Sequence, residues 1–175
     1  MAFVAGDIFD PKNLEVVPPV VSAASVAHES TTTGEDPPSV SAPDLRSLTS
    51  LNPLHGRVFA IHASSFFHMF NEEKQLHVAR ALAGLLSPES GSVIFGMHVG
   101  LPEKGFDPSV AHWHEDHRMW CHSPESWTEL WDGLVFENGM VNVQTELVQM
   151  GKKHLEHDAP QATTFSVLVW SVTRL

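Results

Sequence analysis

The sequence predicts an α/β protein whose sheet contains parallel strands and ends with an antiparallel pair of strands. Two continuous apolar runs, RVFAIHA (57–63) and SVIFGMHV (92–99), are typical of strands buried on both faces. A helical pattern lies between them, so the two strands should be parallel and joined by a right-handed crossover. Two segments rich in β-branched residues come last with no helix between them, and such strands pair antiparallel.

The first element expected is a short strand at the start of the chain. Phe3, Val4 and Ala5 are apolar, Gly6 and Asp7 follow where the strand would end, and Asp10-Pro11 begins a loop. An acidic residue at the carboxyl end of a strand commonly lies beside a bound ligand in α/β sheets. The alternative for Asp7 is a cap or an Asx-turn, in which the carboxylate binds its own backbone.

Residues 11–56 differ from the rest of the chain in composition. They are rich in Pro, Ser, Thr and Ala, which favours a long surface insertion that is largely disordered in its middle. PDLRSLTSL (43–51) predicts one short helix, because its leucines recur every three residues. The chain therefore divides into a strand and turn (1–10), an insertion (11–56) and a patterned region (57–175).

Two helices have clear boundaries. In NEEKQLHVARALAGLLSPESG (71–91), Asn71 suits the N-cap and Pro88 and Gly91 end the helix. Its apolar stripe consists of Leu76, Ala79, Leu82 and Leu86. In SPESWTELWDGL (123–134), Ser123 suits the N-cap and Pro124 the first turn. The final strands are MVNVQTELVQM (140–150) and TTFSVLVWSV (163–172).

Composition excludes several classes of function. The formal net charge is −11 and no basic stripe is present, so a nucleic-acid partner is not expected. Cys121 is the single cysteine, which excludes an intrachain disulfide and favours a reducing compartment. The sequence contains neither a signal-peptide pattern nor an apolar run of the roughly 18 to 20 residues that cross a bilayer. We expect a cytoplasmic protein that does not bind membranes.

Histidines cluster in HWHEDHRMWCH (112–122), together with Glu115 and Asp116. Zinc accepts such ligands, but the spacing fits no closed structural site. Three interpretations remain open: a metal site using His112, His114 and His117, the wall of a substrate pocket, or a polar loop. We therefore predict no metal-binding residues in this protein.

Four sequence blocks resemble one enzyme family. GDIFDP, GRVFAIHASSFFHMF, LLSPESGSVIFGMHVG and MWCHSPESWTELW occur in the order found in class I S-adenosylmethionine-dependent methyltransferases, in particular the meroterpenoid-type group of fungal secondary metabolism. The resemblance implies the carboxyl-terminal part of a Rossmann-like sheet. It also implies S-adenosyl-L-methionine as cofactor and a small-molecule acceptor as substrate.

The resemblance also implies roles for individual residues. Asp7 would accept a hydrogen bond from the adenine amine, and the Ile8 amide would lie near a ring nitrogen. The full set expected at the cofactor is Gly6, Asp7, Ile8, Phe9, His62, Ala63, Ser64 and Phe67. His68 would orient or deprotonate an acceptor hydroxyl, since its ordinary pKa lies near neutrality, and His98 is a second candidate base. A histidine that only binds backbone is the alternative for His68.

One feature of the family is missing from the sequence. Its first strand carries a Gly-rich turn that cradles the cofactor, and this chain contains no such turn. The resemblance therefore indicates a member truncated at its N-terminus, and two alternatives stay open: part of an active enzyme, or a non-catalytic partner subunit. An incomplete sheet exposes an edge and an apolar face, so we also expect self-association.

Overall fold

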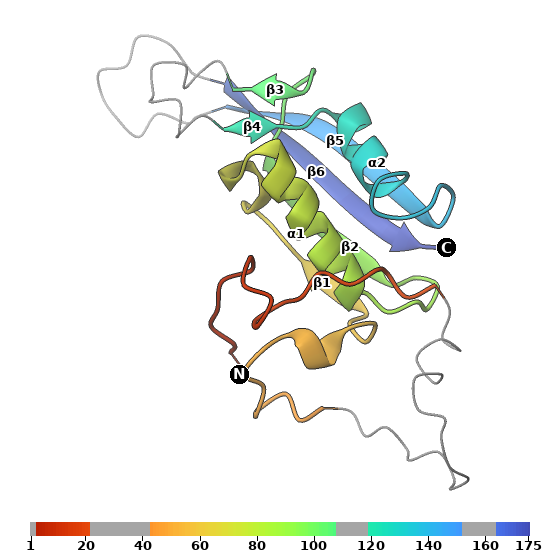
Figure 1. Ribbon diagram of the computed structural model, residues 1–175. Coiled ribbons are helices and arrows are strands. Elements are labelled where there is room, and N and C mark those ends of the chain that lie inside the picture. The colour runs from red at the N-terminus through yellow and green to blue at the C-terminus, as the bar shows by residue number, and fades with distance from the viewer. Residues whose placement is uncertain (1–2, 22–42, 108–118, 152–163) are drawn as a thin grey trace, which may run out of the picture.

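A mixed sheet forms the centre of the computed structural model, which describes residues 3–21, 43–107, 119–151 and 164–175 (Figure 1). Within these residues the main sheet has four strands in the order β1-β2-β6-β5. Their bounds are Ala60–His62 for β1, Val93–Val99 for β2, Thr164–Arg174 for β6 and Val141–Gly151 for β5. A second, two-stranded sheet pairs β3 (Gly105–Phe106) with β4 (Trp120–Cys121).

The strand directions agree with the sequence prediction. β1 and β2 pair in parallel, and β5 and β6 pair antiparallel along their whole length. β6 also pairs antiparallel with β2, so the last strand of the chain lies between β2 and β5. β1, β2 and β5 therefore run in one direction and β6 in the other, which gives the mixed α/β architecture.

Two α-helices cover one face of this sheet (Figure 1). α1 (Glu72–Leu85) begins at Asn71, whose side chain accepts a hydrogen bond from the Lys74 amide at 2.9 Å. α2 (Pro124–Trp131) begins at Ser123. The Ser123 hydroxyl accepts a hydrogen bond from the Ser126 amide, and the Ser126 hydroxyl accepts one from the Ser123 amide, which forms a capping box. Both predicted N-caps are confirmed. Two 3-10 turns, η2 (Asn52–Leu54) and η3 (Phe67–Met69), precede α1.

The core lies between these helices and the sheet. Alternate residues of each strand point into it, and large aromatic side chains from η3, α2 and β6 fill its centre. The Phe67 and Trp127 rings meet edge to face with centroids 4.9 Å apart, and the Trp127 and Trp170 centroids lie 5.0 Å apart. Burial of so much aromatic surface is the main stabilising contribution available to this small sheet.

Three expectations about local structure are wrong. Residues 3–7 form no strand, and Phe3 is 84% exposed, because no described strand lies alongside them to complete a ladder. Residues 43–51 form turns rather than a helix, since Asp44 binds the Arg46 amide through its side chain. The first apolar run yields only the three-residue β1, at the edge of the described sheet, with Ala60 and His62 exposed.

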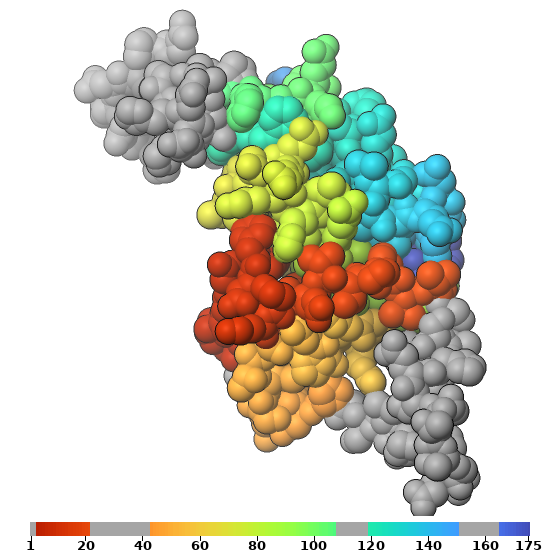
Figure 2. Space-filling view, viewed as in Figure 1, coloured from red at the N-terminus to blue at the C-terminus, as the bar shows by residue number. Residues whose placement is uncertain are grey.

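The described part of the predicted insertion is packed on the molecule. Residues 3–21 lie across the surface between α1 and residues 43–60 (Figure 2). Leu14 is buried, and Asn52 binds the Glu15 amide and the Pro11 carbonyl through its side chain. The middle of the insertion, residues 22–42, lies outside the described residues, so its expected disorder stays a prediction. No described helix is long and apolar enough to cross a membrane.

Candidate active site

The carboxyl ends of β1 and β2 form the candidate site, because parallel strands bring the residues that follow them to one edge of a sheet. After β1 the chain continues beside β2 with two backbone hydrogen bonds, from Ala63 to Phe95 at 2.9 Å and from Ser65 to Met97 at 2.7 Å. Ser65 adopts a φ of 53°, which is uncommon for a residue other than glycine. Backbone strain of this kind is often found at functional sites.

Gly96 makes this close approach possible. A Cβ atom at position 96 would overlap the Ala63 carbonyl oxygen, which lies directly against the glycine. The chain can therefore cross β2 only where β2 has no side chain. Gly96 is a site-forming residue that sequence patterning missed, since the strand run gives no sign of which position its neighbour crosses.

His62 and Ser64 provide polar groups at this edge. The Ser64 hydroxyl and His62 Nε2 form a hydrogen bond of 2.7 Å, and the same hydroxyl accepts one from the Met97 amide at 3.2 Å. A hollow of about 350 Å³ lies beside them, lined by Ile61, His62, Ala63, Ser64, Phe66 and Leu82. Polar groups at the rim of an apolar hollow are typical of a small-molecule site.

The amino-terminal segment lies close to this region. The Phe9 ring meets the Phe70 ring edge to face, with centroids 5.1 Å apart, and also contacts His77. The Asp7 carboxylate is exposed and accepts a hydrogen bond from the Phe9 amide at 2.9 Å. This is the Asx-turn that the residues alone allowed, and it leaves the second carboxylate oxygen of Asp7 available. Cofactor binding by Gly6, Asp7, Ile8 and Phe9 stays a prediction.

Phe67 does not lie at the surface of the site. Its side chain is 0% exposed and packs on His98, Trp127, Trp131 and Trp170. η3 turns the Phe67 side chain into the core, and the expected contact of Phe67 with the cofactor stays a prediction. Ala63, also buried, contributes its backbone to the hollow.

Three histidines lie near one another where η3, the end of β2 and the start of α2 meet. The His68 and His98 rings lie nearly parallel, with centroids 6.4 Å apart, and the His98 and His122 rings both contact Trp127. Each histidine has one buried ring nitrogen with no hydrogen-bond partner among the described residues: Nδ1 of His68, Nε2 of His98 and Nε2 of His122. Buried polar atoms are seldom left unpaired in folded proteins.

The protonation state of His98 follows from its one partner. The Trp170 indole N–H donates a hydrogen bond of 3.0 Å to His98 Nδ1, so Nδ1 is an acceptor and the proton of the neutral ring resides on Nε2. Burial, followed by the nearby His68 and His122, lowers the pKa of His98 to about 3. His98 is thus a neutral donor at physiological pH, and its role as the second candidate base stays a prediction.

His68 is better suited to accept a proton. Its side chain is half-buried, and burial lowers its pKa from the ordinary value, which keeps the ring unprotonated at neutral pH. A general base needs both this state and access to its substrate. Of the two predicted catalytic histidines, His68 is the more exposed, and its role as a base stays a prediction.

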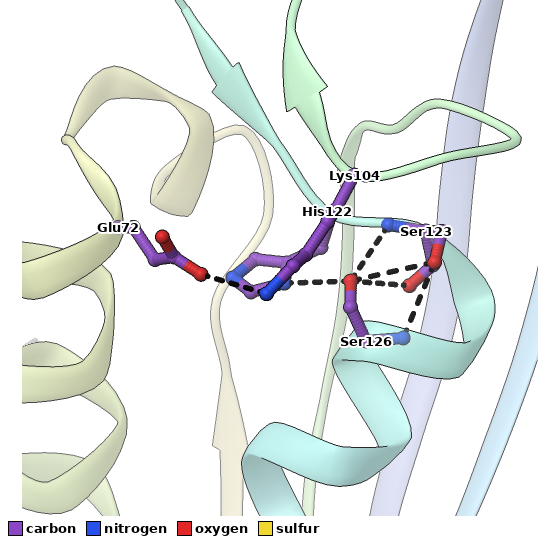
Figure 3. A network of polar contacts seen from close by, with 5 residues as sticks. All are labelled: Glu72, Lys104, His122, Ser123 and Ser126. Atoms are coloured by element: carbon purple, nitrogen blue, oxygen red, sulfur yellow. Dashed lines mark hydrogen bonds and ion pairs between the residues drawn. The ribbon is translucent and has the colours of Figure 1, made fainter.

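His122 joins the site to the polar network shown in Figure 3. Its Nδ1 lies 2.9 Å from the Ser126 hydroxyl, which also accepts a hydrogen bond from the Ser123 amide. Nearby, Lys104 and Glu72 form an exposed ion pair of 3.2 Å. Burial and the Lys104 charge lower the pKa of His122 to about 4, while Glu72 acts in the opposite direction. The ion pair connects α1 to the loop before β3, and the contact of His122 with Ser126 connects the end of β4 to α2.

Metal binding receives no support from the described residues, which contain no group of three or more His, Cys, Asp or Glu able to hold a metal ion. His112, His114 and His117 lie outside these residues, so their predicted role is untested. Cys121 is buried, and burial raises the pKa of its thiol to about 12, which excludes a reactive thiolate near neutral pH.

Comparison with known proteins supports a relationship to methyltransferases. No protein-family model matches the chain. The chain is similar to "O-methyltransferase phiE" from Fungal sp. (strain ATCC 74256), with 32% identity over 89 residues. The matched part covers 51% of this chain and 29% of that protein, so the chain spans less than a third of the length of the curated relative it matches.

Proposed function

We propose that this chain forms the carboxyl-terminal part of the catalytic domain of an S-adenosylmethionine-dependent O-methyltransferase, acting on a small-molecule acceptor of fungal secondary metabolism. The observation that carries the proposal is the similarity to a fungal O-methyltransferase over half of the chain. The mixed sheet, with its antiparallel final pair and a polar edge at β1 and β2, is the architecture that the family resemblance implies.

The described residues fit one part of the cofactor. Asp7 offers an exposed carboxylate to an amino group, and His62 and Ser64 offer hydrogen-bonding groups beside an apolar hollow. The sequence contains no Gly-x-Gly turn to hold the ribose and carboxylate groups. When bound, the cofactor supplies an activated methyl group, and the catalytic part of this chain would be confined to orienting and deprotonating the acceptor.

His68 and His98 divide these tasks in the proposal. The acceptor hydroxyl transfers its proton to the unprotonated His68 imidazole, which leaves an oxygen nucleophile. His98 holds its proton on Nε2, fixed by the bond from Trp170 to Nδ1, and acts as a donor in the wall behind His68. Alignment of the nucleophile then supplies most of the rate enhancement for transfer of an activated methyl group.

Calorimetric titration of the chain with S-adenosylmethionine tests the proposal. We expect binding that Asp7→Ala weakens by roughly tenfold or more, because a charge-assisted hydrogen bond is lost. Asp10→Ala is the matched control, since Asp10 also binds a nearby amide, that of Lys12, but lies outside the predicted contact. Equal weakening by the two variants would contradict the assignment of Asp7.

The family resemblance leaves a second candidate function open, that of a non-catalytic partner subunit. The same titration separates the two. No binding of the cofactor by a folded chain, checked by circular dichroism, would exclude the catalytic proposal for this chain and support the second candidate.

A further inference from the structure

Residues 7–15 form a coil that is held in place by side chains from another part of the chain. They contain no helix or strand, and they belong to the segment that lies across the surface between α1 and residues 43–60 (Figure 2). Leu14 in this coil is nonetheless only 2% exposed. A coil has no regular backbone ladder, so its conformation depends on the partners that its backbone groups find elsewhere.

Asn52 supplies two of these partners with one side chain. Its Oδ1 accepts a hydrogen bond from the Glu15 amide at 2.8 Å, and its Nδ2 donates one to the Pro11 carbonyl at 3.0 Å. The neighbouring Leu51 amide donates a hydrogen bond to the Asn13 carbonyl at 2.8 Å. Because the side-chain amide of Asn52 is planar and binds a donor on one side and an acceptor on the other, it fixes the coil between Pro11 and Glu15.

The Asp7 turn is attached to this fixed coil. The Asp7 carbonyl accepts a hydrogen bond from the Asp10 amide at 3.1 Å and another from Asn13 Nδ2 at 3.3 Å. The Asn13 side chain also lies directly against Gly6, where a Cβ atom would overlap it. The connection from Asn52 to Asp7 therefore runs through the coil.

We infer that Asn52 is a positioning residue for the cofactor, because it holds the Asp7 carboxylate in place for the adenine amine before the cofactor binds. The inference rests on the proposed function, in which Asp7 accepts a hydrogen bond from that amine. Asp7 is exposed, so packing around its own side chain does not fix it. A binding group that is ordered in advance removes the entropy cost of ordering it from the free energy of binding.

Hydrogen–deuterium exchange of the full chain without cofactor tests whether Asn52 orders the coil. Asn52→Leu removes both hydrogen bonds at similar volume, and the amides of residues 9–15 should exchange roughly tenfold faster or more. Asn52→Asp keeps the acceptor for the Glu15 amide but loses the donor to the Pro11 carbonyl, so we expect a smaller increase. The amides of β6 report whether each variant is folded.

Asn142→Leu is the matched control for the exchange experiment. Asn142 is an exposed asparagine on β5, the strand at the opposite edge of the described sheet from β1, and its replacement should leave the amides of residues 9–15 unchanged. Unchanged exchange in Asn52→Leu, or an equal increase in Asn142→Leu, would overturn the inference.

Calorimetric titration with S-adenosylmethionine tests the connection to Asp7. Asn52→Leu should raise the dissociation constant roughly tenfold, and Asn142→Leu should not. In the double variant Asp7→Ala/Asn52→Leu, the second substitution should add little to the first, because Asn52 acts through Asp7. Additive effects, or an unchanged dissociation constant in Asn52→Leu, would overturn the inference and leave the proposed function standing. Failure of the unmodified chain to bind S-adenosylmethionine would overturn both.

Discussion

Gly96 lies where the candidate site leaves no space for a side chain. The chain after β1 crosses β2 there, and any side chain would overlap the Ala63 carbonyl. We expect Gly96→Ala to lower the free energy of unfolding by about 1–3 kcal/mol, because backbone atoms must move apart in a packed region. Urea unfolding followed by tryptophan fluorescence measures this change.

Gly105→Ala provides the control for this prediction. Gly105 also lies in a strand, but a Cβ atom there would have no neighbour within 4 Å. The free energy of unfolding of the Gly105→Ala variant should therefore differ little from that of the unmodified chain. Similar losses in the two variants would show that a general strand effect, and not the crossing at Gly96, sets the cost.

Side-chain roles at the site could be predicted only in part. His68 and Ser64 follow an apolar run, and that position alone suggests a strand end. The pairing of Trp170 with His98 could not be foreseen, because it depends on the register between two strands that are 72 positions apart at this contact. The same holds for Phe67, whose direction is set by η3 and not by its neighbours in sequence.

At the scale of elements, helix ends were predictable and strand ends were not. Asn71 and Ser123 act through residues three positions away, so the sequence contains both partners of each cap. A strand depends on neighbours that are distant in sequence. FVA at residues 3–5 has the composition of a strand, yet it forms none because no described strand pairs with it.

The cap of α2 gives a prediction for an element. Ser123→Ala removes the hydroxyl that accepts a hydrogen bond from the Ser126 amide, and should cost about 1 kcal/mol of stability. Ser123→Asp retains an acceptor and should preserve most of the stability. Thermal unfolding by circular dichroism distinguishes the two. An equal loss in both variants would mean that packing of the serine, and not capping, stabilises the helix start.

For the whole molecule, the buried histidines make stability depend on pH. The pKa values of His98 and His122 are about 3 and about 4, below the ordinary value of 6.5. The unfolded chain therefore binds protons that the folded chain does not. This contribution to stability is fully present above pH of about 6.5 and is lost as the pH falls toward the folded values.

Urea unfolding between about pH 7.5 and pH 5 measures the effect, with a slope of at most about 1.4 kcal/mol per pH unit for each histidine. His98→Gln should flatten the profile, because it removes one of the two buried histidines that take up a proton on unfolding. A profile that is flat in the unmodified chain would contradict the assignment of a buried, neutral histidine group.

The position of β6 has a consequence for how the molecule acquires its structure. β1 and β2 precede β5 in the sequence, but β5 meets them only through β6. A chain emerging from the ribosome can pair β1 with β2, yet it cannot join them to β5 before β6 has been synthesised. The amides of β6, flanked by a strand on each side, should then exchange with deuterium more slowly than those of the edge strands.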